Sequence, residues 1–140
     1  MTAACSFDEF SASCAEIPPR VLVIDDEPLV CWSLVAGFRH AGFEAGAVDS
    51  PEETRQFVDS PPDVVLLDVR LWGSDPPRLL EQLGRLWPKC KVLLLAVEGQ
   101  EVPPACRNLG VVRKPFDLAA VVRRVQDLLS GPPDGVRMAV

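Results

Sequence analysis

Residues 63–68 have the sequence Asp63-Val64-Val65-Leu66-Leu67-Asp68, in which four apolar side chains lie between two carboxylates. An unbroken apolar run of this length is typical of a strand that is covered on both faces, as in the middle of a parallel sheet. Asp68 would then stand at the carboxyl end of the strand, the edge where open α/β sheets bind ligands. The stretch therefore predicts a buried strand with a functional carboxylate at its end.

Two other apolar runs also lead into charged side chains. Arg20-Val21-Leu22-Val23-Ile24 precedes Asp25-Asp26-Glu27, and Val111-Val112-Arg113 precedes Lys114-Pro115-Phe116. If these runs are parallel strands near the first one, three or four carboxylates and one ammonium group converge at one edge. Carboxylates so close raise one another's pKa values, and a bound divalent cation relieves the repulsion. Hard oxygen ligands favour Mg²⁺, Mn²⁺ or Ca²⁺.

Asp25-Asp26, Asp68 after a later strand, and Lys114-Pro115-Phe116 after the last strand resemble the receiver domain of bacterial two-component response regulators. The resemblance covers roughly residues 20 to 129. It implies an α/β fold, with a doubly wound parallel sheet of five strands in the order 2-1-3-4-5 and five flanking helices. We expect a flexible N-terminal arm over 1–19, the receiver domain over 20–130 and a C-terminal tail over 131–140.

The apolar runs and turn signals predict strands and helices in alternation. The expected strands are 20–24, 43–48, 64–68, 91–97 and 110–113, and the expected helices are 28–40, 51–59, 77–87, a short or irregular one within 98–109, and 118–129. Pro103-Pro104 would interrupt the fourth helix. Gly42 should end the first helix, whose expected apolar face comprises Leu29, Trp32, Leu34, Val35 and Phe38.

The resemblance assigns a role to each matching residue of the predicted site. Asp68 would be the nucleophile that becomes an aspartyl phosphate. Asp26 would ligate Mg²⁺ directly, while Asp25 would act through a water molecule or position the ion. The backbone carbonyl of Arg70 would complete the protein ligands. Lys114 would pair with Asp68 before phosphorylation and, with Mg²⁺, neutralise the charge on the transferred phosphoryl group.

Several positions bear on how such a site would work. Receivers end the fourth strand with a serine or threonine that contacts the phosphoryl group, and Ala96 stands there without a hydroxyl. Val111 stands where receivers carry an aromatic switch residue. The Arg70 side chain is expected to reach over the site, where it would hold the phosphate or shield it from water. The bond between Lys114 and Pro115 is expected to be cis, as X–Pro bonds permit.

Composition bounds the partners of this chain of 140 residues. A net charge of −6 argues against binding to nucleic acid, which favours a basic surface. Five cysteines without a C-x-x-C pair, and no secretory signal pattern, predict a cytoplasmic protein. The apolar runs are too short to cross a membrane. We expect a sensor histidine kinase or phosphotransfer protein and a downstream target protein as partners.

Three functions compete for this pattern. The first is a single-domain response regulator, a phosphoacceptor rather than a conventional enzyme, which accepts a phosphoryl group and signals by protein–protein interaction. The second is a pseudo-receiver, a phosphorylation-independent module for constitutive interaction or homodimerisation. The third is a phosphatase of the haloacid dehalogenase type, which needs an acidic residue two positions after the nucleophile. Arg70 occupies that position, so this hypothesis ranks last.

Overall fold

A computed structural model of the chain describes residues 17–57, 60–72, 76–102 and 109–130. Five parallel strands form one sheet in the order β2-β1-β3-β4-β5, which confirms the predicted topology. The strands are β1 (Arg20–Ile24), β2 (Glu44–Val48), β3 (Val64–Asp68), β4 (Lys91–Val97) and β5 (Gly110–Lys114). The helical segments are α1 (Pro28–His40), η2 (Pro51–Phe57), η3 (Val69–Trp72), α2 (Pro76–Leu86) and α3 (Leu118–Leu129).

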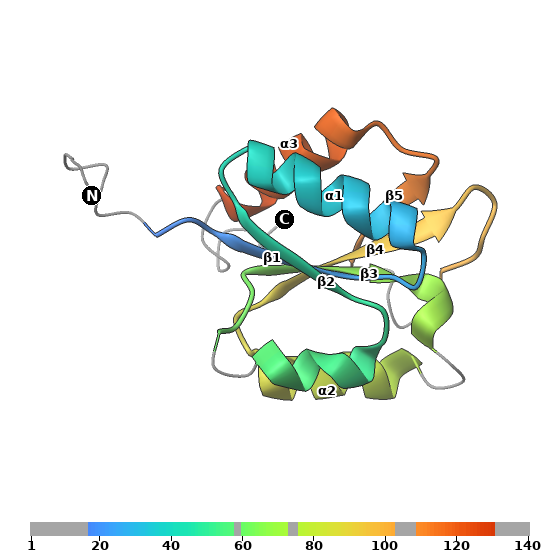
Figure 1. Ribbon diagram of the computed structural model, residues 1–140. Coiled ribbons are helices and arrows are strands. Elements are labelled where there is room, and N and C mark those ends of the chain that lie inside the picture. The colour runs from blue at the N-terminus through green and yellow to red at the C-terminus, as the bar shows by residue number, and fades with distance from the viewer. Residues whose placement is uncertain (1–16, 58–59, 73–75, 103–108, 131–140) are drawn as a thin grey trace.

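The central strands are buried on both faces, as their continuous apolar runs predict. Successive side chains of a strand point to opposite faces, so each strand contributes to two hydrophobic cores. Val64 and Leu66 of β3 lie in the core beneath α1 and α3, whereas Val65 and Leu67 lie in the core that includes Leu83 of α2. In Figure 1, α1 and α3 cover one face of the sheet, and η2 and α2 cover the other.

The ends of the helices follow local signals in the sequence. The Asp117 side chain accepts a hydrogen bond from the N–H of Ala119 and so caps α3, as the sequence predicts. Gly42 follows α1 with φ of 99°, a conformation that favours glycine. The segment predicted as the second helix is a tighter 3₁₀ helix that ends at Phe57. It comprises seven residues, which is longer than the three or four at which most 3₁₀ helices stop.

One prediction about α1 is wrong. Leu34 and Phe38 are buried beneath the helix, but Leu29 is 81% exposed and Trp32 is 72% exposed. Leu29 lies nine positions before Phe38. At about 100° per residue, this spacing places the two side chains on opposite sides of the helix axis. Apolar residues therefore occupy both sides of α1, and only one side packs on the sheet.

Several expectations lie outside the described residues. These are the course of the N-terminal arm before residue 17, the prolines at 103 and 104, most of the expected fourth helix, and the tail from residue 131. Within the described ranges, none of the helices is long and apolar enough to span a bilayer.

Candidate phosphoacceptor and metal site

The carboxyl ends of the strands bring predicted site residues together. Asp25 directly follows β1, Asp68 ends β3 and Lys114 ends β5. The register of the parallel pair places Ile24 beside Leu67, so the next residues along the two strands are Asp25 and Asp68. Both aspartates are buried, and Lys114 is only 9% exposed. Buried charged groups remain ionised when they are paired with opposite charges. Here Lys114 pairs with both Asp25 and Asp68.

The ammonium group of Lys114 donates to three carboxylates. Its Nζ lies 2.8 Å from Oδ2 of Asp25, 2.7 Å from Oε1 of Glu27 and 3.3 Å from Oδ2 of Asp68. The expected pair with Asp68 is present, but the two shorter contacts are to Asp25 and Glu27. Sequence reasoning gave Glu27 no role of its own, although its position as the third acid after β1 was a usable signal. The bond from Lys114 to Pro115 is cis, as predicted.

The side chain of Arg70 reaches the carboxylates from η3, the segment that follows β3. Its Nη2 lies 2.7 Å from Oδ2 of Asp68, 3.1 Å from Oδ1 of Asp26 and 3.2 Å from Oε1 of Glu27. Its Nε lies 3.3 Å and 3.1 Å from the two oxygens of Asp68. The backbone N–H of Arg70 donates to Oδ1 of Asp68 over 2.9 Å. The side chain thus reaches the site as expected, but it lies among the carboxylates instead of only above them.

These contacts set the protonation states of the site. Burial favours the neutral form of Asp68, but hydrogen bonds from Arg70 outweigh it and hold the pKa of Asp68 below its usual range. Burial raises the pKa of Asp25, despite the hydrogen bond from Lys114. Burial also opposes the charge on Lys114, yet its hydrogen bonds to Asp25 and Glu27 keep the pKa of Lys114 above its usual range. Asp68 is therefore an ionised carboxylate beside a protonated amine at neutral pH.

The carboxylates offer a set of hard oxygen ligands. Asp25, Asp26 and Asp68 each contribute one oxygen, and these oxygens lie within 4.8 Å of one another. Magnesium binds oxygen at about 2.1 Å, so ligands on opposite sides of the ion lie about 4.2 Å apart. Small side-chain rotations would bring the three carboxylates to that spacing. The residues therefore fit a magnesium ion, with Asp25 and Asp68 buried and Asp26 exposed.

Two positions beside the site lack the groups that the family resemblance leads one to expect. Leu95 pairs with Asp68 across β3 and β4, and Ala96 is the next residue along β4. Ala96 is buried among the side chains on the α2 face and has no hydroxyl to donate. Val111 is partly buried, packs against the same core and pairs with Leu94. Neither position offers a hydrogen-bond donor to a phosphoryl group through its side chain.

Arg113 connects β5 with the loop that follows β4, a role that no sequence motif indicated. Its Nη1 donates to the carbonyl oxygen of Val97 over 3.0 Å and to that of Gln100. The N–H of Glu98 donates to the carbonyl oxygen of Lys114 over 3.2 Å. The side-chain oxygen of Gln100 accepts from the N–H of Val97 over 3.0 Å. The loop after β4 is thus held against β5 by the chain's own hydrogen bonds.

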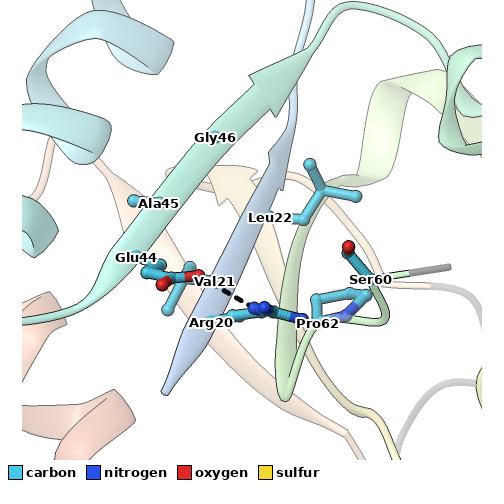
Figure 2. A pocket seen from close by; sticks show the side chains of 8 residues that line it. All are labelled: Arg20, Val21, Leu22, Glu44, Ala45, Gly46, Ser60 and Pro62. Atoms are coloured by element: carbon cyan, nitrogen blue, oxygen red, sulfur yellow. Dashed lines mark hydrogen bonds and ion pairs between the residues drawn. The ribbon is translucent and has the colours of Figure 1, made fainter. Parts of the chain in front are cut away.

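A hollow of about 190 Å³ lies beside the amino ends of β1 and β2 (Figure 2), whereas Asp25 and Asp68 stand at the carboxyl ends of their strands. Nε of Arg20 and Oε1 of Glu44 form an ion pair of 2.8 Å at this hollow. Pockets for small-molecule ligands usually have volumes of at least about 300 Å³. This hollow is therefore smaller than a typical small-molecule site.

Comparisons of the sequence and of the fold with known proteins lead to the same family. A family model described as the response regulator receiver domain matches residues 21–126. The chain belongs to this family. Receiver domains are signalling domains of two-component systems that interact with histidine kinases or phosphotransfer proteins and bind Mg²⁺ at an acidic pocket. Membership in the family counts against the haloacid dehalogenase hypothesis.

Relatives of this receiver differ in length. Protein Rrf1 of Nitratidesulfovibrio vulgaris is 36% identical over 132 residues, which cover 84% of this chain and 91% of Rrf1. The transcriptional regulatory protein PrrA of Mycobacterium tuberculosis is 35% identical over 116 residues, which cover 79% of this chain but only 50% of PrrA. A response regulator from Thermotoga maritima has a TM-score of 0.69 at 21% identity, covering 82% of this chain and 100% of that one. This last likeness shows the fold alone.

Proposed function

We propose that this receiver accepts a phosphoryl group on Asp68 from a histidine kinase or phosphotransfer protein and signals through contacts with a target protein. The observation that carries the proposal is the carboxylate of Asp68, buried at the end of β3 and in contact with both Lys114 and Arg70. We further propose that it acts as a single-domain regulator, which the match across 91% of Rrf1 favours.

The proposed step is a transfer from a phosphohistidine to the Asp68 carboxylate. An oxygen of Asp68 forms a bond to phosphorus, while the P–N bond breaks and its electron pair remains on the imidazole nitrogen of the donor. Because the pKa of Asp68 is held below its usual range, the attacking group is already ionised. Lys114 is positioned to pair with oxygens of the incoming group, since its Nζ already contacts Asp68.

Asp25, Asp26 and Asp68, with the backbone carbonyl of Arg70, would hold Mg²⁺. When bound, this ion would neutralise negative charge that builds up on the phosphoryl oxygens. The carboxylate oxygens within 4.8 Å of one another support the first three ligands. Asp25 is the most buried of them, so its carboxylate would remain fixed while the exposed Asp26 adjusts.

The exposed amino end of α1 provides a surface for a protein partner close to the carboxylate edge of the sheet. Leu29 and Trp32 lie in the first turns of α1, which starts one residue after Glu27. Large apolar side chains in solvent often mark protein contact surfaces. We propose that this part of α1 contributes to the surface that contacts a kinase or a target.

A second candidate function is the pseudo-receiver that interacts without phosphorylation. Three observations favour it: Ala96 has no hydroxyl, Arg113 already holds the loop after β4, and Arg70 already neutralises the carboxylates. Uptake of a phosphoryl group separates the two candidates.

The proposal is tested by locating the phosphoryl group. The protein is incubated with Mg²⁺ and a small acyl phosphate, reduced with borohydride and digested, so that a phosphorylated aspartate is found as homoserine by mass spectrometry. We expect conversion at residue 68 in the wild type and in Asp127→Asn, a matched change on the exposed face of α3. Conversion of Asp25 or Asp26 in the wild type would contradict the assignment. So would an Asp68→Asn variant that is still phosphorylated, at another residue, to the same extent as the wild type.

A further inference from the structure

One nitrogen atom of Arg70 lies among the oxygens that would ligate a divalent cation. Nη2 contacts Oδ2 of Asp68 at 2.7 Å and Oδ1 of Asp26 at 3.1 Å, and it lies 3.8 Å from Oδ1 of Asp25. These are the three aspartates whose oxygens cluster within 4.8 Å. Arg70 therefore does more than pair with Asp68, because a single nitrogen faces all three predicted carboxylate ligands.

A magnesium ion and this guanidinium group cannot share that space. Magnesium would lie about 2.1 Å from each oxygen, whereas Nη2 sits 2.7 to 3.8 Å from the same three side chains. An ion bound to all three carboxylates would overlap the nitrogen, and the two positive charges would repel each other. Binding of the ion requires the Arg70 head group to move away.

We propose that the Arg70 side chain is a tethered cation that occupies the divalent-cation position and competes directly with Mg²⁺. It stands in for the metal by neutralising the carboxylates, and the metal binds only after it has left. This inference rests on the metal-binding part of the proposed function and not on phosphoryl transfer.

The local structure allows the side chain to leave without unfolding the site. The Arg70 side chain is 42% exposed, so a route to solvent is open. The backbone N–H of Arg70 holds Oδ1 of Asp68 independently of the side chain. Lys114 continues to pair with Asp25, Glu27 and Asp68 when the guanidinium is gone. Only the head group of Arg70 has to exchange with the ion.

The competition weakens cation binding by a measurable factor. Arg70 makes charge-assisted hydrogen bonds that are stronger than neutral ones, but its exposure to solvent reduces their net value. We therefore expect removal of the head group to tighten Mg²⁺ binding roughly tenfold rather than many thousandfold.

Isothermal titration calorimetry with Mg²⁺ on the wild type, Arg70→Gln and Arg85→Gln tests this. Arg85 is an exposed arginine of α2 paired with Glu81, so its variant removes the same charge away from the site. We expect Arg70→Gln to bind roughly tenfold more tightly than the wild type, and Arg85→Gln to bind as the wild type does. Equal affinities in all three proteins would overturn the competition while leaving a magnesium site intact. Absence of binding in all three would overturn both the competition and the metal site.

A second measurement uses only the wild type, so its outcome does not depend on whether a variant folds. The Nε–H resonance of Arg70 in ¹⁵N-labelled protein reports its contact with Asp68. We expect it to shift during a Mg²⁺ titration toward the position of an exposed arginine, in parallel with the calorimetric isotherm. An unchanged resonance at saturating Mg²⁺ would show that the two cations bind together, and the proposal would be wrong.

Discussion

Lys114 is the residue on which the buried charges of the site depend most. It is the cation closest to Asp25, whose side chain is fully buried. Removing one partner of a buried ion pair leaves an uncompensated charge, which typically costs about 3–5 kcal/mol. Because Arg70 remains nearby, we expect Lys114→Met to lower the free energy of unfolding at pH 7 by about 2–4 kcal/mol. Urea denaturation measures this, with the exposed Lys89→Met as the matched control.

The pH dependence of the Lys114→Met variant provides a further check. The hydrogen bond from Lys114 lowers the pKa of Asp25, which burial raises. Without it, the pKa of Asp25 in the folded chain lies still further above that in the unfolded chain. The folded state then binds a proton more readily, so the stability of the variant should rise as the pH falls from 7 toward 5. A variant whose deficit stays constant over that range would show that Asp25 is not the unpaired group.

Arg70 should also lengthen the life of an aspartyl phosphate. Whether the guanidinium pairs with the phosphoryl oxygens or excludes water, removing it exposes the acyl phosphate to hydrolysis. We expect the half-life of phosphorylated Arg70→Ala to be shorter than that of the wild type by roughly three- to tenfold. The decay of the phosphorylated species is followed by intact mass after the donor is removed. A half-life that does not change would remove Arg70 from any role after phosphorylation.

At the scale of elements, α1 has a buried side and an exposed apolar side. Leu34 is fully buried, whereas Leu29 is 81% exposed on the same helix. Truncation of a buried leucine costs about 2–5 kcal/mol, because it removes apolar contacts and leaves a cavity. We expect Leu34→Ala to lose stability in that range and Leu29→Ala to change it by less than about 0.5 kcal/mol. Chemical denaturation of the two variants measures this, and equal losses would contradict the observed packing of α1.

The loop after β4 should be held mainly by Arg113. Its guanidinium donates to two carbonyl oxygens of this loop, those of Val97 and Gln100. We expect Arg113→Val to speed amide hydrogen exchange at Glu98 and Gln100 by roughly tenfold, because the local opening of the loop becomes easier. Arg123→Val, on the exposed face of α3, is the control. Equal protection in Arg113→Val and the wild type would mean that backbone hydrogen bonds alone hold the loop.

The elements themselves followed from the sequence to different degrees. The runs ending at Ile24 and Asp68 predicted β1 and β3, because a strand covered on both faces must be apolar throughout. The position of Asp117 before an apolar stripe predicted the cap of α3. The inward face of α1 was predicted incorrectly, because apolar residues at helical spacing do not say which side meets the sheet. Leu29 and Trp32 fitted the pattern yet face solvent.

At the scale of the whole molecule, the sheet gathers charges that are far apart in the sequence. The strand order came from the family resemblance, since apolar runs alone do not determine which strands are neighbours. That order predicted the meeting of Asp25, Asp68 and Lys114 at one edge. The approach of Arg70 to the site was expected from the sequence. The contact of Arg70 with Glu27 and that of Glu27 with Lys114 were not, because they depend on side-chain conformations in the packed site. Glu27 and Arg70 both affect the charge balance of the site, in which four carboxylates share two cations. The carboxylates are those of Asp25, Asp26, Glu27 and Asp68, and the cations are Arg70 and Lys114.

The measurement that tests the site most directly is the intact mass of the protein after incubation with a small acyl phosphate. It is made with Mg²⁺, with a chelator in place of Mg²⁺, and with Asp68→Asn in the presence of Mg²⁺. A working receiver site predicts the addition of one phosphoryl group to the wild type with Mg²⁺ and little or none in the other two samples. An unmodified wild type, under conditions in which another receiver domain is phosphorylated, would contradict phosphoacceptor function and favour the phosphorylation-independent module.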